Sequence, residues 1–107
     1  MRVDRIENHD TGWFIGNFDE AFFRTALFEL GVKTFKAGMS EKKHIHVLLD
    51  EFTVVLKGTI RINDNTFRPG DIIRIEKNET CKFEAVTDCE IVVCKTPSIP
   101  GDKKIIE

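Results

Sequence analysis

Residues 38–58 read GMSEKKHIHVLLDEFTVVLKG, and this stretch decides how the rest of the chain is interpreted. Two histidines, His44 and His46, stand at positions i and i+2. On a β-strand such a pair points to one face, because successive side chains alternate sides. Glu51 follows five residues after His46, at the start of the next expected strand, so its carboxylate can close on the same point.

These three side chains are candidate metal ligands. Two imidazoles and one carboxylate with open positions are typical of non-haem iron(II), and zinc, nickel and manganese accept related donors. Burying the three groups without a partner would cost on the order of several kcal/mol, so a metal ion or a hydrogen-bond network has to compensate. The sequence therefore predicts one divalent transition metal, iron, zinc, nickel or manganese, held by His44, His46 and Glu51.

Around this stretch the sequence predicts an all-β protein. From Phe28 onward the hydrophobic period is two, with Leu30 and Val32 on one face and Gly31 and Lys33 on the other. Short β-like runs recur about every eight to twelve residues, a spacing typical of a sandwich or barrel, and turn residues separate them. The expected strands are His44–Leu48, Glu51–Leu56, Thr59–Ile62, Ile72–Ile75, Thr80–Ala85 and Glu90–Lys95.

The length of 107 residues fits one domain, 1–107. We divide it into an N-terminal arm and edge strand (1–27), a barrel (28–95) and a C-terminal arm (96–107). The net charge of −2 gives no basic face for nucleic acid. No apolar run has the length of a signal peptide core or a membrane span. Three cysteines without a Cys-x-x-Cys pair argue against a disulfide framework and a zinc ribbon, so we expect a cytoplasmic protein.

The spacing Gly38-x5-His44-x-His46-x4-Glu51-x6-Gly58 resembles the first motif of the cupin superfamily and fits it at all five positions. Residues 68–71, Arg-Pro-Gly-Asp, resemble the opening of the second cupin motif. The resemblance covers residues 28–95. It implies a double-stranded β-helix, or jelly-roll barrel, with ligands bound inside.

The second motif then departs from the cupin pattern. The places of its proline, glycine and histidine ligand hold Glu76, Asn78 and Cys81. Cys81 alternates with polar neighbours, as Phe83 does, so its side chain is expected to point to the interior. A thiolate is a good zinc ligand, which makes Cys81 a candidate fourth metal ligand. The alternative is a small buried apolar side chain.

Three functions fit these residues, and they leave open whether the protein is an enzyme. The first is a metal-binding cupin of small-molecule metabolism with an unassigned reaction. The second, implied by the resemblance, is a metal-free sugar-nucleotide isomerase or epimerase that uses one imidazole of the His-x-His pair as a base. The absence of tyrosine removes a common proton donor from that mechanism. The third is a non-catalytic sensor or small-ligand binder.

We also expect a homodimer with a small-molecule ligand. Cupins commonly dimerise through a sheet edge, and an exposed edge needs covering. The N-terminal segment contains four phenylalanines that are expected to contribute to the core or to the interface. They are Phe14, Phe18, Phe22 and Phe23.

Overall fold

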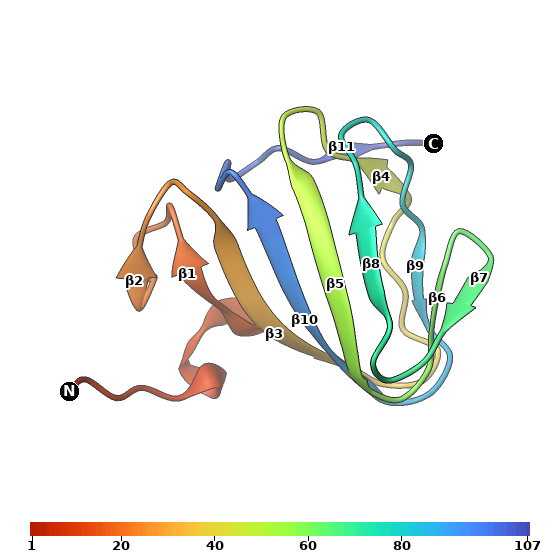
Figure 1. Cartoon of the computed structure of the whole chain (residues 1–107), viewed down its shortest axis with the longest axis horizontal. Helices are drawn as coiled ribbons and strands as arrows, with labels where there is room; N and C mark the ends of the chain where they lie inside the picture. The colour runs from red at the N-terminus through yellow and green to blue at the C-terminus, as the bar shows by residue number, and fades with distance from the viewer.

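The computed structural model describes all 107 residues, and it is built almost entirely of β-strands (Figure 1). A six-stranded sheet has the order β2-β1-β3-β10-β5-β8, a three-stranded sheet has the order β7-β6-β9, and β11 pairs with β4. The large sheet consists of β1 (Trp13–Gly16), β2 (Phe23–Arg24), β3 (Glu29–Phe35), β5 (Asp50–Lys57), β8 (Ile72–Ile75) and β10 (Cys89–Thr96). The small sheets consist of β4 (His44–Ile45), β6 (Ile60–Ile62), β7 (Asn65–Phe67), β9 (Phe83–Ala85) and β11 (Lys104–Ile105).

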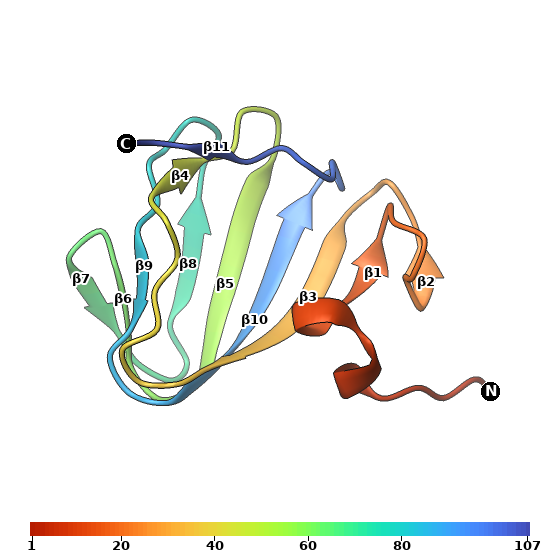
Figure 2. The same cartoon turned by 180° about the vertical axis from the view of Figure 1, so that it is seen from behind.

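The helical content is two short 3-10 turns, η1 (Ile6–Asn8) and η2 (Asp10–Gly12). Figure 2 shows both turns beside β3 at the N-terminal side of the molecule. Neither has the length or the hydrophobicity that crossing a membrane requires of a helix.

The hydrophobic core lies between the large sheet and the three-stranded sheet. Ring centroids of Phe35 on β3 and Phe83 on β9 lie 4.7 Å apart, so the two sheets meet face to face. The ten buried core residues come from both sides of this interface: Val55, Ile60, Ile62, Ile75, Cys81, Phe83, Ala85, Cys89, Ile91 and Val93. The all-β prediction is confirmed.

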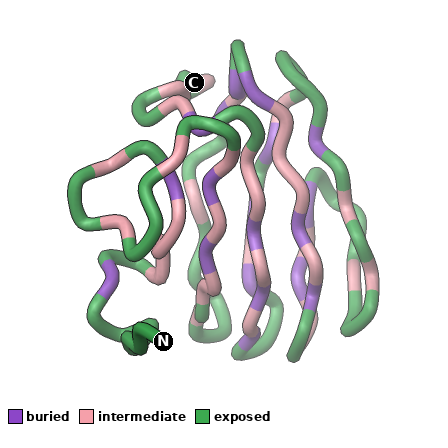
Figure 3. Tube along the Cα trace, turned by 60° about the vertical axis from the view of Figure 1, so that its left-hand side comes forward, coloured by how far each residue is buried: buried purple, intermediate pink, exposed green.

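Burial alternates along the strands of the large sheet (Figure 3). On β10, Ile91 and Val93 are buried, whereas Val92 and Cys94 between them are half-buried on the outer face. On β3, Gly31 and Lys33 belong to the inner face, and the apolar residues between them belong to the outer face. The inner face of this sheet therefore carries polar as well as apolar side chains.

Gly58, the last residue of the opening motif, turns the chain from β5 into β6. Its φ of +77° lies in the left-handed region that glycine adopts without strain. A Cβ atom at this position would lie 2.1 Å from the carbonyl oxygen of Asp88. The turn therefore requires a residue without a side chain.

Two of the predicted strands are shorter in the structure than expected. The expected strand His44–Leu48 ends at Ile45, because the N–H groups of the next turn donate to the Asp102 carboxylate and not to a strand. The expected strand Thr80–Ala85 is reduced to β9 and an isolated bridge between Cys81 and His44. Strands β2, β7 and β11 have no counterpart among the predicted strands. Strand β11 brings the C-terminal arm across the end of the barrel beside β4 (Figure 2).

Candidate metal centre

His44 and His46 form one wall of the candidate site. His44 is the first residue of β4 and His46 follows the strand directly, and both are 3% exposed. Their ring centroids lie 5.0 Å apart with an interplanar angle of 73°. The i and i+2 spacing thus directs both imidazoles into the interior, as the sequence predicts.

Glu51 on β5 meets the two histidines from the neighbouring sheet. Its Oε1 lies 3.3 Å from His46 Nε2, and its side chain is 13% exposed. The ligand atoms of His44, His46 and Glu51 all lie within 4.8 Å of one another. The three candidate ligands converge on one point inside the protein.

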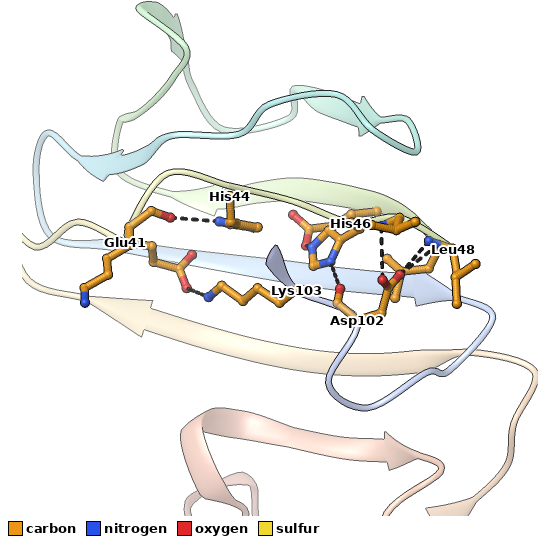
Figure 4. A network of polar contacts seen from close by, with 10 residues as sticks. Glu41, His44, His46, Leu48, Asp102 and Lys103 are labelled. Carbon is orange, nitrogen blue, oxygen red and sulfur yellow. Dashed lines mark hydrogen bonds and ion pairs between the residues drawn. The ribbon is translucent and has the colours of Figure 1, made fainter. Parts of the chain in front are cut away.

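Two main-chain carbonyl groups fix the tautomers of the histidines. His44 Nδ1 donates to the carbonyl of Lys42 at 2.9 Å, and His46 Nδ1 donates to the carbonyl of Asp102 (Figure 4). A carbonyl oxygen only accepts, so each ring carries a proton on Nδ1, and the neutral form of each ring has its lone pair on Nε2. Metal-binding histidines are commonly oriented in this way by a backbone carbonyl.

The charges of these groups follow from burial and from their neighbours. Burial lowers the pKa of His44, which keeps its imidazole neutral at pH 7. Burial opposes the ionisation of Glu51, but the hydrogen bond with His46 and the positive charge of Lys95 outweigh it, so the pKa of Glu51 lies below its ordinary value. The site therefore offers a neutral imidazole beside an ionised carboxylate.

The donor set fits a divalent metal on its own chemistry. With its Nδ1 proton donated to Asp102, a neutral His46 presents a lone pair at Nε2 to the lone pairs of the Glu51 carboxylate, 3.3 Å away. Two acceptors this close require either a shared proton or a cation between them. A transition metal accepts a lone pair from each group, including His44.

Solved structures with the same architecture supply an independent comparison. A protein of Klebsiella pneumoniae with a double-stranded β-helix domain aligns with a TM-score of 0.70 and 17% identity, over 78% of this chain and 73% of that chain. An RmlC-like cupin protein of Desulfovibrio desulfuricans aligns with a TM-score of 0.61 and 26% identity, over 70% of this chain and 76% of that chain. The chain has the cupin fold.

Other comparisons are consistent with this assignment at the level of the fold. The bacterial pirin YhhW of Escherichia coli, solved in complex with nickel(II), aligns with a TM-score of 0.67 and 15% identity, over 82% of this cupin-fold chain and 39% of the pirin. No protein-family model and no curated protein matches the sequence. The double-stranded β-helix expected from the first motif is confirmed.

Cys81, the candidate fourth ligand, lies opposite His44 in this cupin fold. His44 N donates to the carbonyl of Cys81 at 3.0 Å, and Cys81 N donates to the carbonyl of His44 at 2.8 Å. Cys81 lines the same cavity, but it is not part of the group of converging ligand atoms. Burial, and then the negative charge of Glu51, raises the pKa of the Cys81 thiol to about 12, so the thiol is protonated at neutral pH.

The sequence analysis missed the role of Asp102, which lies 56 residues after His46. Its carboxylate accepts hydrogen bonds from the N–H groups of Val47, Leu48 and Leu49 at 3.0, 2.8 and 3.1 Å, and its carbonyl accepts the His46 Nδ1 proton. Figure 4 shows the residue beside His46. The C-terminal arm thus holds both the ring and the turn that follows it.

The sequence analysis also missed the cationic residues of the cavity wall. Lys33 on β3, Lys95 on β10 and Lys103 in the C-terminal arm line the cavity together with Glu41 and Trp13. Lys95 is the direct cross-strand partner of Glu51. The only sequence signal for Lys33 and Lys95 was their place in the strand alternation, which does not tell the inner face from the outer one.

Proposed function

We propose that this protein binds one divalent transition metal through His44, His46 and Glu51, and that the metal takes part in binding a small molecule in the adjoining cavity. The observation that carries the proposal is the pair of Nδ1 hydrogen bonds to main-chain carbonyls, which leaves both Nε2 lone pairs available. A bound divalent metal would supply Lewis acidity, polarising a carbonyl group or lowering the pKa of a bound water molecule.

The residues around the ligands have distinct tasks in this proposal. Asp102 orients His46, and the carbonyl of Lys42 orients His44. Lys95 neutralises part of the charge of Glu51 from the neighbouring strand. The buried walls formed by Thr53, Ile91 and Val93 limit the water that can reach the site. Together they hold two imidazoles and one carboxylate in a largely enclosed space.

The donor set narrows the metal but does not select one element. Two histidines and one carboxylate suit iron(II), and nickel, zinc and manganese fit the same donors when water completes the coordination. Cys81 would favour zinc or nickel if it were a ligand. Its position outside the group of converging ligand atoms favours a role in the cavity wall instead.

A second candidate function is a metal-free isomerase or epimerase, and the contact between His46 and Glu51 favours it. A doubly protonated His46 would donate Nε2–H to Glu51 at 3.3 Å, so that the pair could move a proton to or from a bound sugar. This mechanism needs no metal, and metal analysis therefore separates the two candidates.

The test is elemental analysis of protein purified without added metal or chelator, followed by titration of the metal-free protein. We expect about one equivalent of a transition metal, and a loss of affinity of at least about tenfold in His46→Gln and in Glu51→Gln. Glu76→Gln, at an exposed carboxylate outside the cavity, is the matched control and should bind metal normally. A wild-type protein that neither retains nor binds any transition metal would refute the proposal.

A further inference from the structure

We propose that the cavity beside His44 and Glu51 is the binding site of a small carboxylate, and that Lys33 and Lys95 recognise its negative charge. The inference rests on the proposed function in that it names the class of ligand for the same cavity. Four features of the structure carry it: the position of the two lysines, their lack of partners, the charge of the cavity and its size.

Lys33 and Lys95 stand on the inner face of the large sheet, and the ammonium group of each lies near Trp13. The Nζ atoms of Lys33 and Lys95 lie 5.2 and 4.8 Å from centroids of the Trp13 ring system. The indole lies over Gly31, where an added Cβ would come within 2.8 Å of the ring. The glycine thus makes room for the indole, and two neighbouring strands each bring an ammonium group near its ring.

Neither ammonium group has an anionic partner within the protein. No carboxylate oxygen lies within 4.0 Å of Lys33 Nζ or Lys95 Nζ, and neither group donates a hydrogen bond. Lys103 differs, because its Nζ lies 3.9 Å from Glu41 Oε2. Burial lowers the pKa of Lys33, so the protein bears a cost for keeping this amine in the cavity.

The charges that line the cavity leave an excess of positive charge. Glu41 pairs with Lys103, and Lys95 offsets part of the charge of Glu51. The three ammonium groups of Lys33, Lys95 and Lys103 thus outnumber the two carboxylates by one positive charge, and a divalent metal at the histidines would add to this excess. A bound carboxylate would neutralise the excess charge and could contact the metal at the same time.

The size of the cavity favours a carboxylate over a larger anion. The volume of the cavity is about 30 Å³, which is enough for a planar carboxylate group and little more. Lys33 and Glu41 also border a wider groove of about 440 Å³, whose walls include Ile6, Phe35 and Met39. A carboxylate in the inner cavity could therefore carry a short organic remainder that extends into this groove.

The experiment measures binding of glycolate, its neutral analogue glycolamide and inorganic phosphate to cobalt(II)-loaded and to metal-free protein by calorimetry. We expect glycolate to bind at least about tenfold more tightly than glycolamide, the difference expected for charge-assisted contacts, and more tightly than phosphate. Lys33→Gln and Lys95→Gln should each weaken glycolate binding about tenfold without changing the affinity for glycolamide, and Lys33→Gln should also leave the affinity for cobalt unchanged. Lys57→Gln, at the exposed end of β5, is the matched control.

Equal affinity for glycolate and glycolamide, unchanged glycolate binding in both variants, or tighter binding of phosphate would each overturn the inference. Lys33→Arg guards against a folding defect, because it keeps the charge and should keep the glycolate affinity if the fold is intact. Cobalt affinity is measured first, so the two proposals fail separately. If cobalt binds normally but glycolate is not preferred, only the proposed carboxylate site is refuted. If the protein takes up no metal but binds glycolate through Lys33 and Lys95, only the metal proposal is refuted.

Discussion

Asp102 forms hydrogen bonds with the His46 ring and with the turn that follows His46, although it lies 56 residues further along the sequence. Its carbonyl accepts the Nδ1 proton of His46, and its carboxylate accepts the N–H groups of the turn that begins at Val47. The C-terminal arm therefore determines both the tautomer of one proposed ligand and the path of the chain from β4 to β5.

Replacement of this residue should weaken the site and the fold together. In Asp102→Ala the N–H groups of Val47, Leu48 and Leu49 lose their acceptor, and we expect the free energy of unfolding to fall by about 1–3 kcal/mol. The metal affinity should fall about tenfold, because the support of His46 is loosened. Chemical denaturation and metal titration measure the two effects. Asp10→Ala, at an exposed carboxylate with no hydrogen bond, should change neither the stability nor the metal affinity. An Asp102→Ala protein with wild-type stability and wild-type metal affinity would contradict the role of Asp102.

Lys33→Met should stabilise the protein at neutral pH, by about 1 kcal/mol. Burial lowers the pKa of Lys33 in the folded protein, so its charged form destabilises the fold below that pKa. As the pH rises from the folded-state pKa towards the ordinary value of 10.5, the folded protein releases the proton before the unfolded chain does, and the wild type gains stability. The advantage of the variant should therefore shrink in this alkaline window. Urea denaturation between neutral pH and pH 10.5 tests the trend, with the exposed Lys57→Met as control. A Lys33→Met protein that is less stable than wild type at pH 7 would show that burial of the Lys33 ammonium group does not destabilise the fold.

Cys81→Ala distinguishes a cavity-wall residue from a fourth ligand. We expect it to keep the metal stoichiometry and to lose about 1 kcal/mol of stability from lost packing. Cys89→Ala removes another buried core thiol away from the cavity and should behave in the same way. Metal analysis and thermal denaturation of the two variants provide the comparison. A selective loss of metal from Cys81→Ala would make its sulfur a ligand.

The dimer expected from the sequence remains a prediction, and the edge of the large sheet suggests how to test it. Phe22 and Phe23, at the edge strand β2, are 38% and 57% exposed. Light scattering at micromolar concentration should give twice the mass of one chain, and Phe23→Glu should shift it to the mass of a monomer. Val86→Glu, at an exposed apolar residue outside β2, should leave the dimer intact. A monomeric wild-type protein would refute the prediction.

The fold and the three proposed ligands could be predicted because their signals are local. His44, His46 and Glu51 lie within eight residues of one another, and strand alternation alone sends the first two to the same face. The motif that begins at Gly38 ends at Gly58, in a turn that only glycine can occupy. These features require no knowledge of distant parts of the chain.

Other parts of the site depend on contacts that the sequence does not display. Asp102 stands in a Pro-Gly-Asp turn, a common turn composition, and its partners are fixed only when the C-terminal arm crosses the barrel. Lys33 alternates with Leu30 and Val32, which suggests that the apolar face is the buried one. In the folded protein Leu30 and Val32 lie half-buried on the outer face of the large sheet. The face that carries Lys33 is the one that lines the cavity.

Anomalous X-ray diffraction at transition-metal absorption edges, from crystals of protein purified without chelator, would locate a metal bound by the three side chains. We expect one anomalous peak about 2.0–2.3 Å from His44 Nε2, His46 Nε2 and a carboxylate oxygen of Glu51. A map without a peak among these three side chains, in a crystal soaked with iron, zinc, nickel or manganese salts, would contradict it.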